Sequence, residues 1–237
     1  MGESAGQVVL VTGAAGNLGA AVATAFAAQG ARLALMDREA GRLEDARRAL
    51  GLDADTVLLP ADLLSAQSTA TAAEAAIARL GRIDVLANIA GGFTMGPPLH
   101  ETPEADWDLM MGLNARSVLN TCRAVIPQML RQGNGRIVNV AARAALEGKA
   151  RMGPYCASKA AVITLTETLA AEHRDHGINV NCLLPGTIDT PQNRASMPDA
   201  DFSRWVSPTA LADVVVFLAT DAARAISGAA IPVYGRS

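Results

Sequence analysis

The stretch "VTGAAGNLG", residues 11–19, places a glycine-rich turn between an apolar run and an alanine-rich segment. The run before it, "QVVLVT" at 7–12, has the composition of a buried strand, and residues from about 17 to 29 have that of a helix. "RLALM" at 32–36 predicts a second strand, so the chain begins as a βαβ unit. A turn of this kind leaves backbone N–H groups and a positive helix end free to bind a pyrophosphate. It is also compatible with a plain strand-to-helix connection.

The rest of the chain continues this alternation of strands and helices. Further strands are expected at 56–60, 85–88, 136–140, 178–184 and 229–233, and helices near 39–50, 66–80, 104–132, 156–175 and 208–220. Strands that are apolar on both faces belong to a parallel sheet covered on both sides, and right-handed crossovers make such a sheet doubly wound. We therefore predict one α/β domain over residues 1–237, with about seven parallel strands. The polar stretch 190–206 is predicted to be a short substrate loop or lid.

Composition excludes several classes of protein. Apolar residues make up 50% of the 237, so a sizeable core is expected. The net charge is −3 and there is no dense block of Lys or Arg, which argues against nucleic acid or an acidic membrane as a partner. No apolar stretch reaches the roughly 18 residues of a membrane span, and the N-terminus lacks a signal-peptide pattern. We expect a soluble, cytoplasmic protein.

The cysteines and histidines favour neither disulfides nor a metal site. Cys122, Cys156 and Cys182 are far apart in the chain, which fits a reducing compartment. His173 and His176 share one face of an expected helix, but no third ligand is near. Solvated helix surface is the better interpretation, and no metal is predicted.

An acidic residue ends the second expected strand. Asp37 follows Gly13 by 24 residues, where a carboxylate can accept hydrogen bonds from the ribose hydroxyls of adenosine and repel a 2′-phosphate. This favours NAD over NADP. Arg38 leaves an alternative open, because it could contact a 2′-phosphate instead of projecting into solvent near the adenine. The charge of Asp37 favours the solvent-facing arrangement.

These features resemble the short-chain dehydrogenase/reductase family, and the resemblance covers nearly the whole chain. The family's TGxxxGxG turn is matched by Thr12, Gly13, Asn17 and Gly19, with Leu18 inside the motif. Asn17 stands where the middle glycine is usual. We expect this substitution to be mild because asparagine tolerates left-handed backbone. The resemblance implies a Rossmann fold that binds NADH and a small-molecule substrate.

Three further motifs carry the resemblance. In "ADLL", Asp62 with Leu63 matches the family's adenine-contacting acid, and "NIAGG" matches its NAG strand end. "PGTIDT" matches the turn that follows the sixth strand. The resemblance implies that the cofactor site includes, from the last two motifs, Asn88, Ala90, Gly91, Pro185, Gly186, Ile188 and Thr190. Ile188 and Thr190 correspond to the residues that hold the nicotinamide carboxamide.

The stretch "YCASK" matches the family's YxxxK motif, and the resemblance implies that Tyr155 and Lys159 contact the cofactor as well as catalyse. Tyr155 and Lys159 are four residues apart, which on a helix places them on the same face about 6 Å apart along the axis. A nearby ammonium and an oxidised nicotinamide favour the phenolate, so we expect Lys159 to lower the pKa of Tyr155. Asn114 matches the family's helix asparagine that anchors a water between this lysine and solvent. Ordinary roles, as a buried tyrosine, a solvated lysine and a buried amide, stay open for these three.

One motif departs from the family. Its usual serine, thirteen residues before the tyrosine, is replaced by Ala142, which follows Ala141, and no Ser or Thr occurs from Cys122 to Ala157. Loss of one oxyanion donor commonly costs about 10² to 10³ in turnover. Either the protein reduces ketones poorly, or its substrate needs less help.

Quinonoid dihydropteridine reductase lacks the same serine, and the chain resembles it in other stretches. These are "AARAALEGKARMGPY", the glycine pair before Phe93, and "TIDTPQNRASMPDADFSRW". Asn88 and Asn114 follow the general family instead. The expected function is NADH-dependent hydride transfer to an activated acceptor, such as quinonoid dihydropterin or a conjugated carbonyl or quinone. The alternatives are a general alcohol dehydrogenase or ketoreductase, and a catalytically weak NAD-binding regulatory protein.

The acceptor site and the oligomer are predicted more coarsely. The shortness of the 190–206 segment predicts an open, shallow site. Its candidate walls are Phe93, Met95, Met152 and Trp205, each of which could equally be ordinary core or surface. The long apolar helices predict a homodimer or homotetramer.

Overall fold

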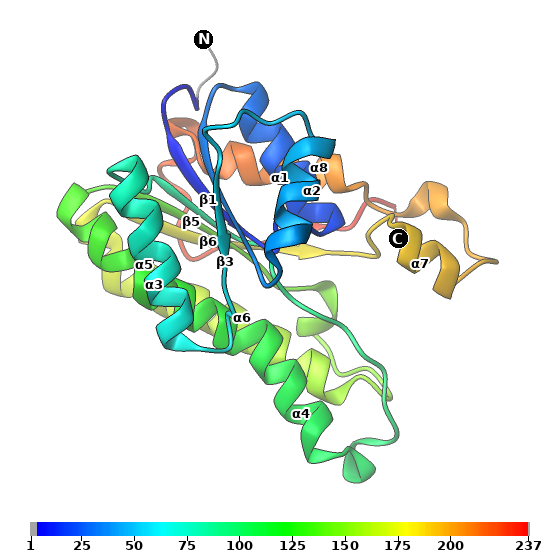
Figure 1. Cartoon of the computed structure of the whole chain (residues 1–237). Coiled ribbons are helices and arrows are strands. Elements are labelled where there is room, and N and C mark those ends of the chain that lie inside the picture. Colours follow the sequence, from blue (N-terminus) through cyan, green and yellow to red (C-terminus); the bar gives the residue numbers. More distant parts are fainter. Residues whose placement is uncertain (1–3, 237) are drawn as a thin grey trace.

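The computed structural model describes residues 4–236, and its centre is a parallel sheet of seven strands (Figure 1). The strands are β1 (Val8–Thr12), β2 (Arg32–Asp37), β3 (Val57–Pro60), β4 (Val85–Asn88), β5 (Gly135–Val140), β6 (Ile178–Pro185) and β7 (Ala230–Val233). Their order is β3-β2-β1-β4-β5-β6-β7. The strand order therefore reverses between β1 and β4, and ligands of doubly wound sheets bind beyond the strand ends at such a point. The predicted fold class is confirmed.

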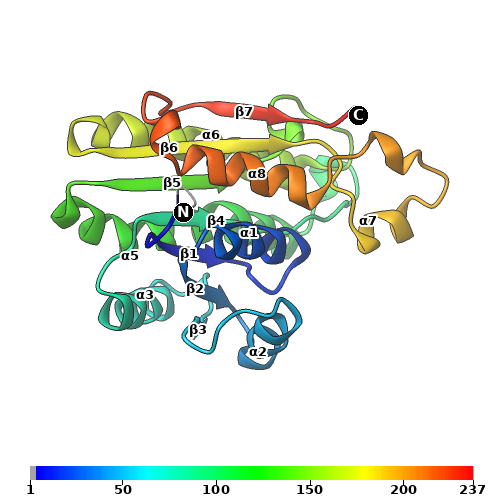
Figure 2. The ribbon, with the colours of Figure 1, turned by 90° about the horizontal axis from the view of Figure 1, so that it is seen from above.

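Helices cover both faces of the sheet. The helices α1 (Asn17–Ala28), α2 (Ala40–Ala49) and α8 (Pro208–Leu218) pack on one face, and α3 (Ala66–Leu80), α5 (Ser117–Gln132) and α6 (Gly153–His173) on the other. Figures 1 and 2 show these two layers with the sheet between them. The strands require both layers because alternate residues point to opposite faces: Val9 joins one core cluster and Leu10 the other. Each such side chain stabilises the fold by about 1.5–3 kcal/mol when fully buried.

The single helix expected at 104–132 is interrupted. The structure has α4 (Glu104–Met110), a π turn at Met111–Arg116 and then α5. In this turn the side chain of Asn114 binds both backbone groups of Gly92: its Oδ1 accepts from the Gly92 N–H at 3.0 Å, and its Nδ2 donates to the carbonyl at 3.1 Å. A π turn adds one residue to a helical turn and is common at functional sites. Here it accompanies the contact between Asn114 and the loop after β4.

Two other boundaries differ from the sequence prediction. The segment 190–206 is not only loop, because it contains α7 (Pro191–Ser196) and a 3₁₀ turn at Phe202–Arg204. Thr190 caps α7 by accepting a hydrogen bond from the Asn193 N–H at 3.2 Å, and proline suits the first helical position. Helix α6 begins at Gly153, three residues earlier than expected, so Tyr155 lies in its first turn.

Two classes of feature are absent from the part of the chain that the structure describes. No helix within residues 4–236 is both long and apolar enough to cross a bilayer. The same residues form no group of three or more His, Cys, Asp or Glu that could hold a metal ion.

Candidate active site

A cavity of about 460 Å³ lies beyond the carboxyl ends of β1, β2 and β4. Residues from the predicted cofactor motifs form much of its lining. Those that the structure brings together here are Gly13, Asn17, Leu18, Gly19, Asp37, Asp62, Leu63, Ala90, Gly91 and Thr190. Gly13 and Thr190, which are 177 residues apart in the chain (190 minus 13), therefore line the same cavity.

The glycine-rich turn has the shape that a pyrophosphate site requires. Gly13 has a φ of 63°, and a Cβ there would lie 2.8 Å from the Cα of Ala90, so only glycine fits. A Cβ on Gly19 would collide with the carbonyl of Gly13. The turn thus packs closely against the end of β4 and exposes the N-terminus of α1 to the cavity, an arrangement that fits a dinucleotide.

The prediction that Asn17 is tolerated because asparagine accepts left-handed backbone is wrong. Asn17 is the first residue of α1, and among the described non-glycine residues only Arg151, with a φ of 64°, has positive φ. A helical position accepts asparagine without left-handed backbone. The side chain of Asn17 instead donates a hydrogen bond to Oε1 of Gln192 at 2.8 Å.

Asp37 is held in place by backbone groups at the edge of the cavity. Its carboxylate accepts hydrogen bonds from the N–H groups of Ala15 at 3.1 Å and Arg38 at 2.8 Å, and its side chain is only 13% exposed. The Arg38 side chain is 78% exposed and lies 3.4 Å from Glu39. The structure therefore has the solvent-facing arrangement of Arg38 and leaves a fixed negative charge at this position.

Several lining residues were not identified from the sequence. They are Gly16, Arg38 as a wall residue, Arg42, Ala61, Leu64, Ile89, Leu113 and Ser117. Gly16, Ala61, Leu64 and Ile89 lie within or beside motifs that were recognised, so proximity was the available signal. Arg42 lies on the first turn of α2, with Nη1 3.9 Å from Asp37. Leu113 lies in the π turn and Ser117 directly after it, and the sequence has no signal for this turn.

Six of the expected cofactor residues do not line this cavity: Asn88, Tyr155, Lys159, Pro185, Gly186 and Ile188. Asn88 is 2% exposed and its side chain joins a buried hydrogen-bond network, donating to Asn139 at 2.8 Å and accepting from Thr121 at 2.7 Å. This network connects β4 with β5 and α5. Pro185 is the last residue of β6, and Gly186 and Ile188 lie in the turn that follows, from which Thr190 reaches the cavity.

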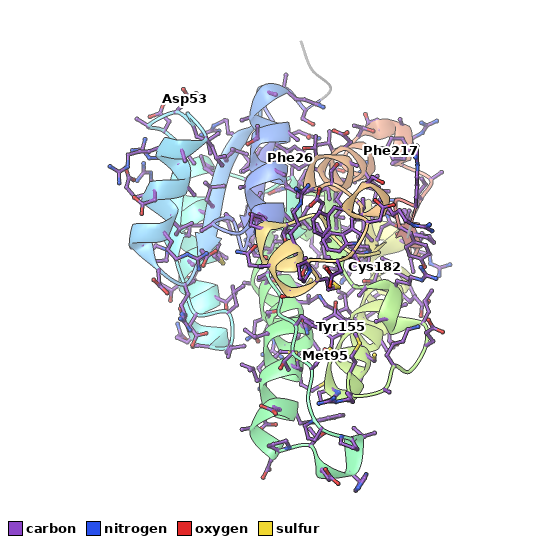
Figure 3. The ribbon with its side chains drawn as sticks, turned by 90° about the vertical axis from the view of Figure 1, so that its right-hand side faces the viewer. Phe26, Asp53, Met95, Tyr155, Cys182 and Phe217 are labelled. Atoms are coloured by element: carbon purple, nitrogen blue, oxygen red, sulfur yellow. The ribbon has the colours of Figure 1, made fainter. Side chains whose placement is uncertain are left out.

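Tyr155 and Lys159 lie on α6, and Lys159 approaches the cavity wall at Gly91. The Nζ of Lys159 donates to the Val140 carbonyl at 2.8 Å, and it would lie 3.1 Å from a Cβ placed on Gly91, a lining residue. The ring of Tyr155 meets the edge of Phe93, with centroids 4.9 Å apart and an angle of 89° between the rings. Figure 3 shows Tyr155 and Met95 in the lower half of the molecule, away from Asp53 at its upper edge.

The expected lowering of the tyrosine pKa does not occur in the protein alone. Burial raises the pKa of Tyr155 to about 12, with a smaller contribution from Cys156. Burial also lowers the pKa of Lys159 to about 8, a change that Cys182 partly opposes. Both groups are therefore held toward their neutral forms, because the low-dielectric surroundings penalise the phenolate and the ammonium alike. The sequence spacing identified the pair but could not indicate how deeply it is buried.

Asn114 connects the loop after β4 with helix α6. Besides its two bonds to Gly92, its Nδ2 donates to Oγ of Ser158 at 2.9 Å, and that hydroxyl donates to the Tyr155 carbonyl at 2.8 Å. Gly91 lies between this amide and Lys159, since a Cβ there would be 2.8 Å from the Asn114 Oδ1. The structure thus brings two of the three predicted catalytic residues, Asn114 and Lys159, to Gly91, and Ser158 links Asn114 to the backbone of Tyr155. The water-anchoring role of Asn114 stays a prediction.

At the position of the family's serine, this chain has the buried methyl group of Ala142. Ala142 is 6% exposed and Ala141 is 2% exposed. The nearest hydroxyl to Tyr155 along α6 is that of Ser158, and its hydrogen is committed to the backbone of Tyr155 itself. It therefore does not replace the missing donor.

Comparisons with known proteins agree with this geometry. The chain matches the short chain dehydrogenase family over residues 7–201. It is 37% identical over 240 residues to the D-threitol dehydrogenase of Mycolicibacterium smegmatis, covering 97% of this chain and 92% of that protein. It is also 37% identical over 243 residues to the 2-(R)-hydroxypropyl-CoM dehydrogenase of Xanthobacter autotrophicus, with 97% of each covered. A solved NAD⁺-bound xylitol dehydrogenase has a TM-score of 0.90 and 28% identity, covering 98% of this chain and 99% of that one.

Proposed function

We propose, because the chain belongs to the short-chain dehydrogenase family, that this NAD-dependent oxidoreductase reduces a planar, electron-poor acceptor. Quinonoid dihydropterin is the acceptor that the sequence resemblance favours, and a conjugated carbonyl or quinone belongs to the same chemical class. The observation that carries the proposal is the buried methyl of Ala142 at the position of the family's second oxygen-binding donor. An acceptor that is already activated toward hydride has less need of that donor.

The chain's own residues account for binding and for the proton. Asp37 receives the adenosine ribose, the glycine-rich turn receives the pyrophosphate, and Thr190 closes the far side of the cavity. Bound NADH supplies the hydride. Tyr155 donates its phenolic proton to the reduced acceptor, and Lys159 beside Gly91 stabilises the phenolate that remains.

The protonation state of Tyr155 suits the role of proton donor. Burial raises the pKa of its phenol to about 12, so the phenol carries its proton throughout the physiological range. The same burial penalises the phenolate that donation leaves, and Lys159 would stabilise that anion.

The walls beside Tyr155 support an apolar, ring-shaped acceptor. Phe93 and Met95 are each 56% exposed, and Phe93 contacts the Tyr155 ring. Exposed aromatic and thioether groups beside a donor suit a flat conjugated ring better than a chain of hydroxyls, which requires several polar partners. The proposed acceptor site is open and shallow, as the sequence predicts.

A second candidate is oxidation of a small secondary alcohol. The 37% identity to a D-threitol dehydrogenase favours it, since that relative is named for a polyol. Under this alternative the missing serine limits turnover, and the reverse reaction reduces simple ketones.

Steady-state assays with NADH separate these candidates. We expect fast reduction of quinonoid dihydropterin or a small quinone, slow reduction of cyclic ketones, and little NAD⁺ reduction with D-threitol or xylitol. Turnover only with alcohols and ketones would establish the second candidate. Tight NADH binding with no turnover on the whole panel would instead favour a regulatory NAD-binding protein.

We also infer one functional domain, in the cytoplasm, that associates with itself. Both core clusters share the one sheet, and Cys122, Cys156 and Cys182 are free and buried, which supports a reducing compartment. Leu119 and Leu130 of α5 are 42% and 39% exposed, and a second copy would cover them. Light scattering on the purified protein should give a dimer or tetramer, and a monomer would refute this part.

A further inference from the structure

Helix α7 belongs to a segment that is stiffened by its own side chains. Arg194 donates two hydrogen bonds to the carboxylate of Asp189, at 2.6 and 2.7 Å, and its guanidinium lies 4.9 Å from the ring centroid of Phe202. Asn193 donates to the Ile188 carbonyl at 2.8 Å. These contacts all lie within residues 187–206, here termed the flap. The flap is therefore cross-linked by its own side chains.

The base of the flap is fixed to the rest of the protein. The N–H of Asp189 donates to the Val206 carbonyl at 2.8 Å, which closes the flap at its base. Arg204 and Arg236 are joined by two hydrogen bonds, at 2.8 and 2.9 Å, through their main chains and the Arg204 guanidinium. Figures 1 and 2 show α7 beyond the end of β6.

The start of α7 is linked to the cavity lining by one side-chain hydrogen bond. The Nδ2 of Asn17 donates to Oε1 of Gln192 at 2.8 Å. Among the described residues, this is the one side-chain hydrogen bond of α7 that leaves the flap. Asn17 and Thr190 both line the cavity, from α1 and from the flap respectively. The hydrogen bond therefore joins the start of α1 to the flap beside two residues of the cavity lining.

We propose that Asn17 and Gln192 form a clasp that holds the flap over the pyrophosphate end of the cavity and slows the release of NAD(H). The motif that this chain resembles has glycine at position 17, which carries no side chain with which to make this contact. Both side chains are exposed, so the bond opens without unfolding anything else. The inference concerns the cofactor and holds for any acceptor.

The effect is expected to be modest. A hydrogen bond between exposed neutral side chains lies at the lower end of the usual range, which corresponds to a change of about threefold in a rate. The clasp must open for every exchange of cofactor, and such steps limit turnover in many enzymes. Asn17 and Gln192 act as positioning residues, since they act through the flap.

Stopped-flow measurement of NADH dissociation tests the clasp. Asn17→Ala removes the donor side chain but keeps the backbone N–H, and alanine is compatible with the first position of α1. Gln192→Ala removes only the acceptor side chain. We expect each to raise the dissociation rate about threefold, with no further increase in the double variant. Ser196→Ala is the matched control on α7, because its hydroxyl bonds only the carbonyl of Gln192, and its dissociation rate should not change.

Hydrogen exchange of the cofactor-free protein gives an independent readout. Amides of residues 190–197 should exchange faster in Asn17→Ala and in Gln192→Ala, to the same extent, while those of α8 do not change. Unchanged dissociation and exchange would overturn the clasp. So would an effect of Asn17→Ala alone, or a double variant whose effect is the product of the two single ones.

Discussion

The two sides of the candidate active site are built differently. The cofactor side consists of strand ends, glycines and backbone N–H groups, with Asp37 fixed by two of them. The acceptor side consists of side chains on α6 and on the loop that follows β4, including Tyr155, Lys159 and Phe93. Backbone geometry follows from local sequence, whereas side-chain burial depends on contacts between distant segments. The cofactor could therefore be identified from motifs, and the acceptor only as a chemical class.

The largest expected effect is on the acceptor side alone. Tyr155→Phe removes the proton donor and should lower kcat by about 10² to 10⁴, the usual contribution of a positioned acid. The dissociation constant of NADH should change less than about twofold, because the phenolic oxygen is what is lost and the cavity lining is intact. Fluorescence titration and initial rates measure the two quantities. A variant that retains most of its turnover would remove Tyr155 from the mechanism.

Buried charge on the acceptor side predicts a pH-dependent stability. The pKa of Lys159 is held at about 8, below its ordinary value of 10.5, so between these values the unfolded chain binds more protons. Stability should therefore rise with pH across this window. Lys159→Met should raise the free energy of unfolding at pH 7 by about 2–3 kcal/mol, after the loss of the Val140 hydrogen bond.

Urea unfolding of both proteins from pH 7 to 10 measures this difference. The difference in the free energy of unfolding between Lys159→Met and the wild type should narrow as the pH rises, because the wild-type protein loses its buried charge. Tyr155 is common to both proteins and cancels in the comparison. Lys149→Met, at a half-exposed position, should change stability by less than about 0.5 kcal/mol. A gap that is constant with pH would show that Lys159 carries no such penalty.

On the cofactor side the expected effect is smaller and confined to nucleotide binding. Asp37→Ala should weaken NADH binding about tenfold, as loss of a charged hydrogen-bond acceptor does, and should narrow the preference over NADPH. The KM for the acceptor should not change. Asp45→Ala on α2 is the matched control and should alter NADH binding less than twofold, since Asp45 is outside the cavity lining and its side chain is 74% exposed. If both variants behave alike, Asp37 does not select the cofactor.

The sequence predicted the sheet well because its strands are apolar on both faces. Val9 and Leu10 are both fully buried, which leaves a covered parallel sheet as the consistent arrangement. The π turn could not be predicted, since it accompanies a contact between Asn114 and Gly92, 22 residues away in the chain. Helix propensity carries no information on such a contact.

The sequence predicted which residues form the candidate site better than it predicted their protonation and contacts. Spacing alone paired Tyr155 with Lys159, but it could not indicate that burial raises the pKa of Tyr155 in the protein alone. The lowering of that pKa beside an oxidised nicotinamide stays a prediction. Asn17 was correctly assigned to the cavity for a reason that the structure corrects, and its partner Gln192 lies 175 residues away. Motifs therefore locate groups, whereas contacts across the fold decide what each group does.

The central claim is that this site works without a second oxygen-binding donor because the acceptor is already activated. The ratio of kcat/KM for a quinonoid acceptor to that for a cyclic ketone, measured in the wild type and in Ala142→Ser, tests it most directly. We predict that the serine raises ketone reduction about tenfold or more and leaves the quinonoid rate nearly unchanged, so the ratio falls. An equal increase for both acceptors, or a wild type that already prefers the ketone, would contradict the account.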